Sequence, residues 1–111
     1  MGYIRGNKSK VWINDRGQMK ITIPKAIGRL IHLRNKDYIG WSWESGKVSI
    51  YRKIDTLRDE SEQKSKIYIS YIGQITTTIP KSIGEAMGIR KGDSVEWLLY
   101  EGKIILKRVD N

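Results

Sequence analysis

The chain has no cysteine and no phenylalanine, and it holds one histidine and two prolines among its 111 residues. Without cysteine there are no disulfides, no thiolate nucleophile and none of the common zinc sites, and a lone histidine has no second imidazole with which to share a metal. No apolar run approaches the ~20 residues that span a membrane, and the opening MGYIRG lacks the apolar stretch of a signal peptide. We therefore expect a soluble, cytoplasmic protein with no metal, no cofactor and no membrane partner.

The arrangements of residues that enzymes use are also missing. The sequence shows no pair of carboxylates at catalytic spacing, no nucleophile elbow and no glycine-rich phosphate loop. It therefore predicts a protein that is not an enzyme. The length suits one compact domain, or two very small units that share one core.

Positive charge is abundant and unevenly placed. The chain holds 21 Lys and Arg against 12 Asp and Glu, a formal net charge of +9. Residues 1–53 hold 12 basic and 3 acidic residues (net +9), residues 54–65 hold 2 and 4 (net −2), and residues 66–111 hold 7 and 5 (net +2). Such an excess attracts polyanions, and nucleic acids are the most abundant polyanions in cells. A basic surface that serves only solubility is the alternative.

The sequence contains an internal repeat. A shift of 56 positions aligns residues 8–52 with residues 64–108 without a gap, and 18 of these 45 pairs are identical. The motif GQxxxTIPKxIG occupies 17–28 in the first copy and 73–84 in the second. The repeat predicts three segments: a first unit with a basic N-terminal arm (1–53), an acidic linker (54–65) and a second unit (66–111).

Each copy has the pattern of two strands, a short helix and two more strands. The first strands are expected at 10–14 and 66–70 and the second at 19–23 and 75–79, because they are rich in β-branched and aromatic residues. Pro24 and Pro80 suit the first position of a helix of about two turns. Two-residue corners at 45–46 and 101–102 predict hairpins, and the four tryptophans at strand positions are expected in the core.

One unit of about 45 residues leaves sheet edges and apolar faces that it cannot cover by itself. The linker, which reaches at most about 40 Å, is long enough to fold the two copies onto each other. We therefore expect one chain to form an internal pseudo-dimer. A homodimer, with barrels built between two chains, is the alternative.

These motifs resemble the AbrB/SpoVT-type swapped-hairpin domain: a strand, Gly-Gln, a strand ending in Thr-Ile-Pro-Lys, a short helix, a Gly-Asp turn and a hairpin with Gly-Lys. The resemblance implies a mostly β fold with two short helices, in which tandem swapped-hairpin repeats form a small pseudo-two-fold β-barrel that binds DNA. The chain departs from the family in two ways. The spacing between Gly-Gln and Ile-Pro is two residues longer, and Gly28 and Gly84 replace a frequent arginine, which removes one expected DNA contact from each copy.

Differences between the copies indicate where a ligand binds. Basic residues of the first copy become Ile72, Thr76, Glu85 and Gly92 in the second, although the fold makes the same demands on both. Basic side chains in one copy alone therefore favour a ligand role, and those present in both copies extend the patch. Gln18 could bond bases or cap its own loop. The predicted DNA-binding residues are Arg16, Gln18, Lys20, Lys25, Arg29, Arg34, Lys36, Lys81 and Arg90.

The sequence thus predicts a DNA-binding transcriptional regulator of the AbrB/SpoVT type, associated with the nucleoid, that contacts double-stranded DNA mainly through the first repeat. The alternatives are the antitoxin of a toxin–antitoxin pair and a nucleoid-type, non-specific DNA binder. We do not expect a toxin partner, because such antitoxins normally carry an extra C-terminal segment and the chain ends at Asn111, just after the last predicted strand. Charge alone leaves RNA open as the ligand.

Overall fold

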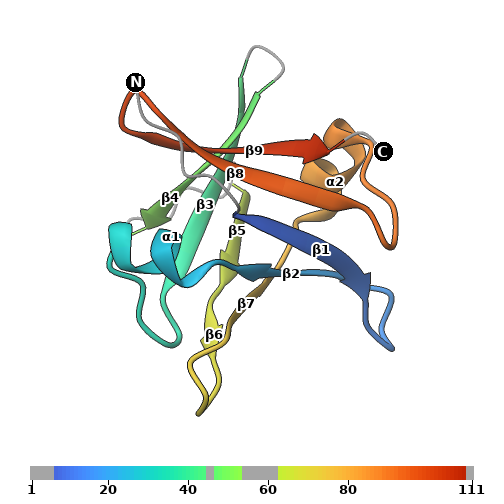
Figure 1. The fold of residues 1–111 in the computed structure, drawn as a ribbon. Coiled ribbons are helices and arrows are strands. Elements are labelled where there is room, and N and C mark those ends of the chain that lie inside the picture. The colour runs from blue at the N-terminus through green and yellow to red at the C-terminus, as the bar shows by residue number, and fades with distance from the viewer. Residues whose placement is uncertain (1–6, 45–46, 54–62, 110–111) are drawn as a thin grey trace.

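A computed structural model describes residues 7–44, 47–53 and 63–109. These residues form nine strands and two short helices (Figure 1). The elements are β1 (Lys8–Ile13), β2 (Met19–Ile23), α1 (Lys25–Leu30), β3 (Tyr38–Glu44), β4 (Lys47–Lys53), β5 (Gln63–Lys66), β6 (Tyr68–Ile69), β7 (Ile75–Thr78), α2 (Lys81–Met87), β8 (Ser94–Tyr100) and β9 (Lys103–Val109). The predicted corner at 45–46 lies outside the described residues.

The strands form one antiparallel sheet in the order β5-β3-β4-β9-β8-β1-β2-β7-β6. This sheet curls until its two ends almost meet, and the Thr77 hydroxyl on β7 donates a hydrogen bond of 2.8 Å to the Lys66 carbonyl on β5. Figure 1 shows the resulting barrel, with β9 crossing its top and β2 and β7 below. The predicted fold class, a mostly β chain with two short helices in a small barrel, is confirmed.

The two halves of the chain interleave. We call residues 7–53 the first half and residues 63–109 the second half. β1 of the first half pairs with β8 of the second (Ser9 opposite Val95), and β5 of the second half pairs with β3 of the first (Ser65 opposite Ile39). Each hairpin is therefore completed by a strand from the other half.

A pseudo-two-fold axis passes through the barrel at two strand pairs. In β2–β7, Ile21 lies opposite Thr77, and in β4–β9, Ser49 lies opposite Ile105. Both pairs join positions that are 56 residues apart, as in the sequence alignment. The two strand pairs therefore mark the two ends of the axis.

The core lies inside the barrel and is built from inward-facing Val, Ile, Leu and Trp side chains. Trp41 and Trp97 are buried, as predicted, and their indole N–H groups donate to the hydroxyls of Ser65 (2.8 Å) and Ser9 (3.0 Å). The prediction is wrong for Trp12 and Trp43, which are 39% and 47% exposed. Trp12 falls on the outer face of β1 because Ser9 and Val11 face inward, and Trp43 lies near the end of β3, beyond the packed interior.

Each helix begins immediately after its proline. Pro24 and Pro80 have φ of −56° with extended ψ of 141° and 140°, so they occupy the N-cap and not the first helical position. A Cβ on Gly28 would lie 2.5 Å from Cδ1 of Ile75, and one on Gly84 would lie 3.1 Å from Sδ of Met19. The helix of each half thus packs against a strand of the other half, and both glycines are buried where the family resemblance would place an arginine.

The strand predicted at 66–70 is divided in two. β5 begins at Gln63, inside the segment expected to be linker, and the pairing is interrupted at Ile67. There, the Ile67 carbonyl accepts from the Lys36 N–H (2.8 Å), and the Ile67 N–H donates to the Asp37 carbonyl (2.7 Å). The predicted corner at 101–102 is present, with left-handed φ of 50° and 76°. No helix in the described ranges is long and apolar enough to cross a membrane.

Candidate nucleic-acid interface

Two loops of the same geometry connect β1 to β2 and β6 to β7. In the first corner (14–18) the Asn14 and Gly17 N–H groups donate to the Gln18 and Asn14 carbonyls, and in the second corner (70–74) the equivalent bonds recur at 2.9 Å. Gly17 and Gly73 adopt left-handed φ of 78° and 85°, a conformation that glycine takes without steric cost. The two loops have the same backbone conformation but different residues at their tips, Asp15 and Arg16 in the first and Tyr71 and Ile72 in the second.

The side chain of Gln18 helps to hold the first corner together. Its Oε1 accepts a hydrogen bond of 2.9 Å from Nδ2 of Asn14, whose own Oδ1 accepts from the Arg16 and Gln18 N–H groups. These bonds fit the loop-capping role that the sequence left open. Contact between Gln18 and a base stays a prediction.

Four cations surround a hollow of about 430 Å³ beside the first corner. We call these residues the first basic group: Arg16, Lys20, Lys64 and Lys66. The Nζ atoms of Lys20 and Lys66 both lie 5.9 Å from the centre of the Tyr68 ring, which also lines the hollow. The group thus combines cations from both halves of the chain.

The sequence comparison missed Lys64 and Lys66. Lys64 falls in the segment expected to be linker and Lys66 at the first position of a predicted strand, away from the corner and helix around which the predicted residues lie. The signal that could have found them is the alternation of β5, in which Ser65 faces inward and its two neighbours face outward.

Two further cations lie on α1 and form the second basic group, Lys25 and Arg29. Together with His32 they line a hollow of about 520 Å³ whose other wall includes Ile69 and Gly73 of the second half. Nζ of Lys25 lies 3.5 Å from the position that a Cβ on Gly73 would occupy. The second basic group is therefore beside the second corner.

The predicted cations of the corner and helix of the first copy lie in two separate places. Arg16 and Lys20 line one hollow, while Lys25 and Arg29 line another. The cause is the interleaving of the halves: β2 pairs with β7, so the arm formed by β6, the second corner and β7 lies between the two groups.

The turns that follow the two helices hold the predicted residues Arg34, Lys36 and Arg90, and Gly92, which is the equivalent of Lys36. Oδ2 of Asp37 accepts from the Arg34 N–H (2.8 Å) and lies 3.4 Å from Nε of Arg52. Asp93 makes the same contacts with the Arg90 N–H and with Arg108. These bonds fix the turns and use the backbone of Arg34 and Arg90, not their guanidinium groups.

Lys36 has a left-handed φ of 72° where the second half has Gly92 with φ of 85°. Lys36, Lys81, Arg34 and Arg90 are exposed, but none of them lines the two basic hollows. In the part of the chain that the structure describes, none of the nine predicted residues forms an ion pair. Their charges are available to an external anion.

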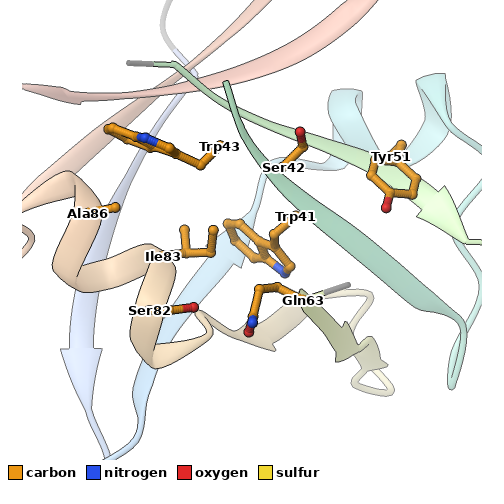
Figure 2. Close-up of a pocket in the computed structure, with 8 residues that line it drawn as sticks. All are labelled: Trp41, Ser42, Trp43, Tyr51, Gln63, Ser82, Ile83 and Ala86. Carbon is orange, nitrogen blue, oxygen red and sulfur yellow. The ribbon is translucent and has the colours of Figure 1, made fainter. Parts of the chain in front are cut away.

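A third hollow, of about 490 Å³, lies between β3 and α2 (Figure 2). Its lining includes Trp41, Trp43, Ile83 and Ala86 and contains no charged side chain. It is therefore a poor site for a polyanion. No group of three or more potential metal ligands occurs among the described residues.

Comparison with known protein families finds a similarity in the second half of the chain. The family model of MazE, described as antidote-toxin recognition by a bacterial antitoxin, matches residues 75–111, about one third of the chain. No curated protein and no solved structure matches the chain. The second half is thus similar to an antitoxin family, which does not support the expectation that a toxin partner is absent.

Proposed function

We propose that this protein is a transcriptional regulator that binds duplex DNA through the first and second basic groups. One observation carries the proposal: cations that the sequence has only in its first half lie on both sides of a single arm of the barrel, Arg16 and Lys20 with Lys64 and Lys66 on one side and Arg29 with Lys25 on the other. The equivalents of Arg16, Lys20 and Arg29 in the second half are Ile72, Thr76 and Glu85. Folding therefore does not require these three cations, whereas the binding of a polyanionic ligand does require them.

The outer face of β2 and β7, which carries Lys20 of the first basic group, is suited to a phosphate backbone. On β2 and β7, Ile21 and Thr77 face the core, so Thr22, Thr76 and Thr78 lie on the outer side. Hydroxyl groups donate hydrogen bonds to phosphate oxygens, while lysine and arginine supply the charge. This face combines both kinds of donor at fixed strand positions.

The salt dependence of binding tests the proposal. If the six cations of the two groups each neutralise one phosphate, log K for a short mixed-sequence duplex falls against log salt with a slope of about −5. Fluorescence anisotropy over a series of salt concentrations measures this slope. A flat dependence, or no binding at low salt, would refute a phosphate-led interface.

A regulator must also distinguish sequences, which phosphate contacts do not. Selection of bound duplexes from a random pool separates the regulator from a nucleoid-type binder. An enriched sequence supports regulation of particular genes. A selected pool without sequence preference supports general DNA coating.

The antitoxin role is the second candidate, and the match of residues 75–111 to an antitoxin family favours it. We expect a toxin to be contacted at the uncharged hollow between β3 and α2, because its α2 wall belongs to the matched segment and Trp43 stands half-exposed there (Figure 2). The test is co-expression with the product of the adjacent gene. Growth arrest by that product, relieved by this chain and not by its Trp43→Ala variant, would support this role.

A further inference from the structure

The tip of the second corner carries two consecutive apolar side chains that the fold does not use. Tyr71 is fully exposed (101%) and Ile72 is 65% exposed. The first corner has the same backbone hydrogen bonds and the same left-handed glycine, but it holds Asp15 and Arg16 at these positions. Since the loop forms with either pair, the apolar pair is explained by a ligand and not by folding.

Cations lie on both sides of the arm that ends in this tip. On one side, the ammonium groups of Lys20 and Lys66 lie 5.9 Å from the ring centre of Tyr68, in β6. On the other side, Lys25 and Arg29 line a hollow with Gly73, in the corner itself. A polyanion held by these cations therefore meets the apolar tip between them.

We propose that Tyr71 and Ile72 form a wedge that enters between neighbouring base pairs of the bound duplex and kinks it; this inference rests on the proposed DNA binding. Side chains that cannot pair with phosphate gain most when they are buried between bases, and proteins that kink DNA use apolar side chains for this purpose. An aromatic ring stacks on any base, because every base has a π face. The cations on either side hold the backbone while the tip enters.

The surroundings favour a nucleic acid over a protein at this tip. A protein interface has an apolar core depleted in charge, and large exposed apolar patches are the mark of such a site. The apolar tip is only two residues wide, and the groups beside it are positively charged. The four hydrogen-bonding groups of the corner backbone hold the tip at a fixed place, as a wedge requires.

The experiment uses the full chain and a short mixed-sequence duplex that carries 2-aminopurine at successive adenine positions and a donor–acceptor dye pair at its ends. 2-Aminopurine brightens when a base step unstacks, and a kink of about 20–90° brings the two ends closer. We expect the unaltered protein to raise 2-aminopurine fluorescence several-fold at one or two positions and to increase energy transfer between the ends.

Two variants isolate the tip from the charge. Tyr71→Asp with Ile72→Arg copies the first corner, and Tyr71→Ser with Ile72→Ser removes the apolar groups without adding an arginine; both leave the net charge unchanged. We expect both variants to lose the fluorescence rise and the change in energy transfer, and the serine variant, which adds no cation, to keep the salt slope. The serine variant should also bind about tenfold more weakly, in line with the loss of one stacked base.

The outcomes separate the wedge from DNA binding itself. A protein that binds with the expected salt slope, but never unstacks or bends the duplex, overturns the wedge and leaves the proposed function standing. A fluorescence rise that both variants retain overturns it as well. Absence of binding at low salt overturns both proposals. Thermal unfolding checks that each variant is folded. If a double variant does not fold, the single variants Tyr71→Ser and Ile72→Ser are tested in its place.

Discussion

Exchanging residues between the halves of the chain tests the interface with side chains that this barrel already accepts. Arg16→Ile with Lys20→Thr alters the first basic group, and Arg29→Glu alters the second. Each variant lowers the net charge by two and introduces the residue found at the equivalent position of the second half. The control is Lys103→Gln with Lys107→Gln, which lowers the charge by the same amount on β9, at the other end of the pseudo-two-fold axis.

The expected loss follows from counterion release. Each phosphate contact contributes about 0.9 to the salt slope, so two lost contacts change it from about −5.4 to about −3.6 and weaken binding about 30-fold at 0.15 M salt. The first variant should show this full loss, and it also removes the contact between Lys20 and Tyr68. Arg29→Glu removes one contact and adds repulsion, so its slope should change by about 1 to 2. The control should retain the slope of the unaltered protein.

Fluorescence anisotropy of a labelled duplex at several salt concentrations gives both affinity and slope. Thermal unfolding checks that each variant is folded, and we expect changes of stability within about 0.5 kcal/mol at these surface positions, apart from the lost Lys20 contact. Equal weakening by the control would show that net charge, and not this face, drives binding. Unchanged slopes in both site variants would refute the interface.

Three further predictions concern the fold. Lys36→Gly should stabilise the protein by up to about 1 kcal/mol, because glycine relieves the strain of the left-handed φ of 72°. Lys36→Ala removes the same charge but keeps the Cβ, so it should not stabilise the protein; thermal unfolding of the two variants separates strain from charge. Ser65→Ala should cost about 1–3 kcal/mol, because it removes the acceptor of the buried Trp41 N–H, while Ser82→Ala on the exposed side of α2 serves as the matched control in the same denaturant titration. Sedimentation at micromolar concentration should give a monomer of 12.9 kDa, since both strand exchanges occur within one chain; a dimer that survives dilution would contradict this.

Local features of the fold could be predicted from the sequence because they depend on neighbouring residues. Each helix begins at the lysine of its Thr-Ile-Pro-Lys segment, since proline restricts the residues around it, and Gly17 and Gly73 adopt the left-handed conformation that their corners need. The β-branched residues of 19–23 and 75–79 likewise indicated β2 and β7. These signals all act over a few residues.

The arrangement of the candidate site could not be predicted in the same way. Lys25 lies next to Gly73, 48 positions along the chain, because β2 pairs with β7 and the halves interleave. No local pattern encodes that partnership. Lys64 and Lys66 were missed because the pairing of β5 with β3, which brings them to the site, is not encoded locally either. A strand position also does not tell which face is buried, which is why Trp12 and Trp43 were misplaced.

The pairing of β1 with β8 affects how the protein can fold while it is being synthesised on the ribosome. Val11–Ile13 of β1 pair with β2, which follows directly, but Lys8–Lys10 pair with β8 and have no partner until β8 has been made. At about 5–20 residues per second, this wait lasts several seconds, during which the edges and apolar faces of the first half are uncovered. Contacts between residues so far apart in sequence also slow folding. A nascent chain that stalls before β8 therefore lacks the strands that complete the barrel, and it is a natural substrate for chaperones and proteases.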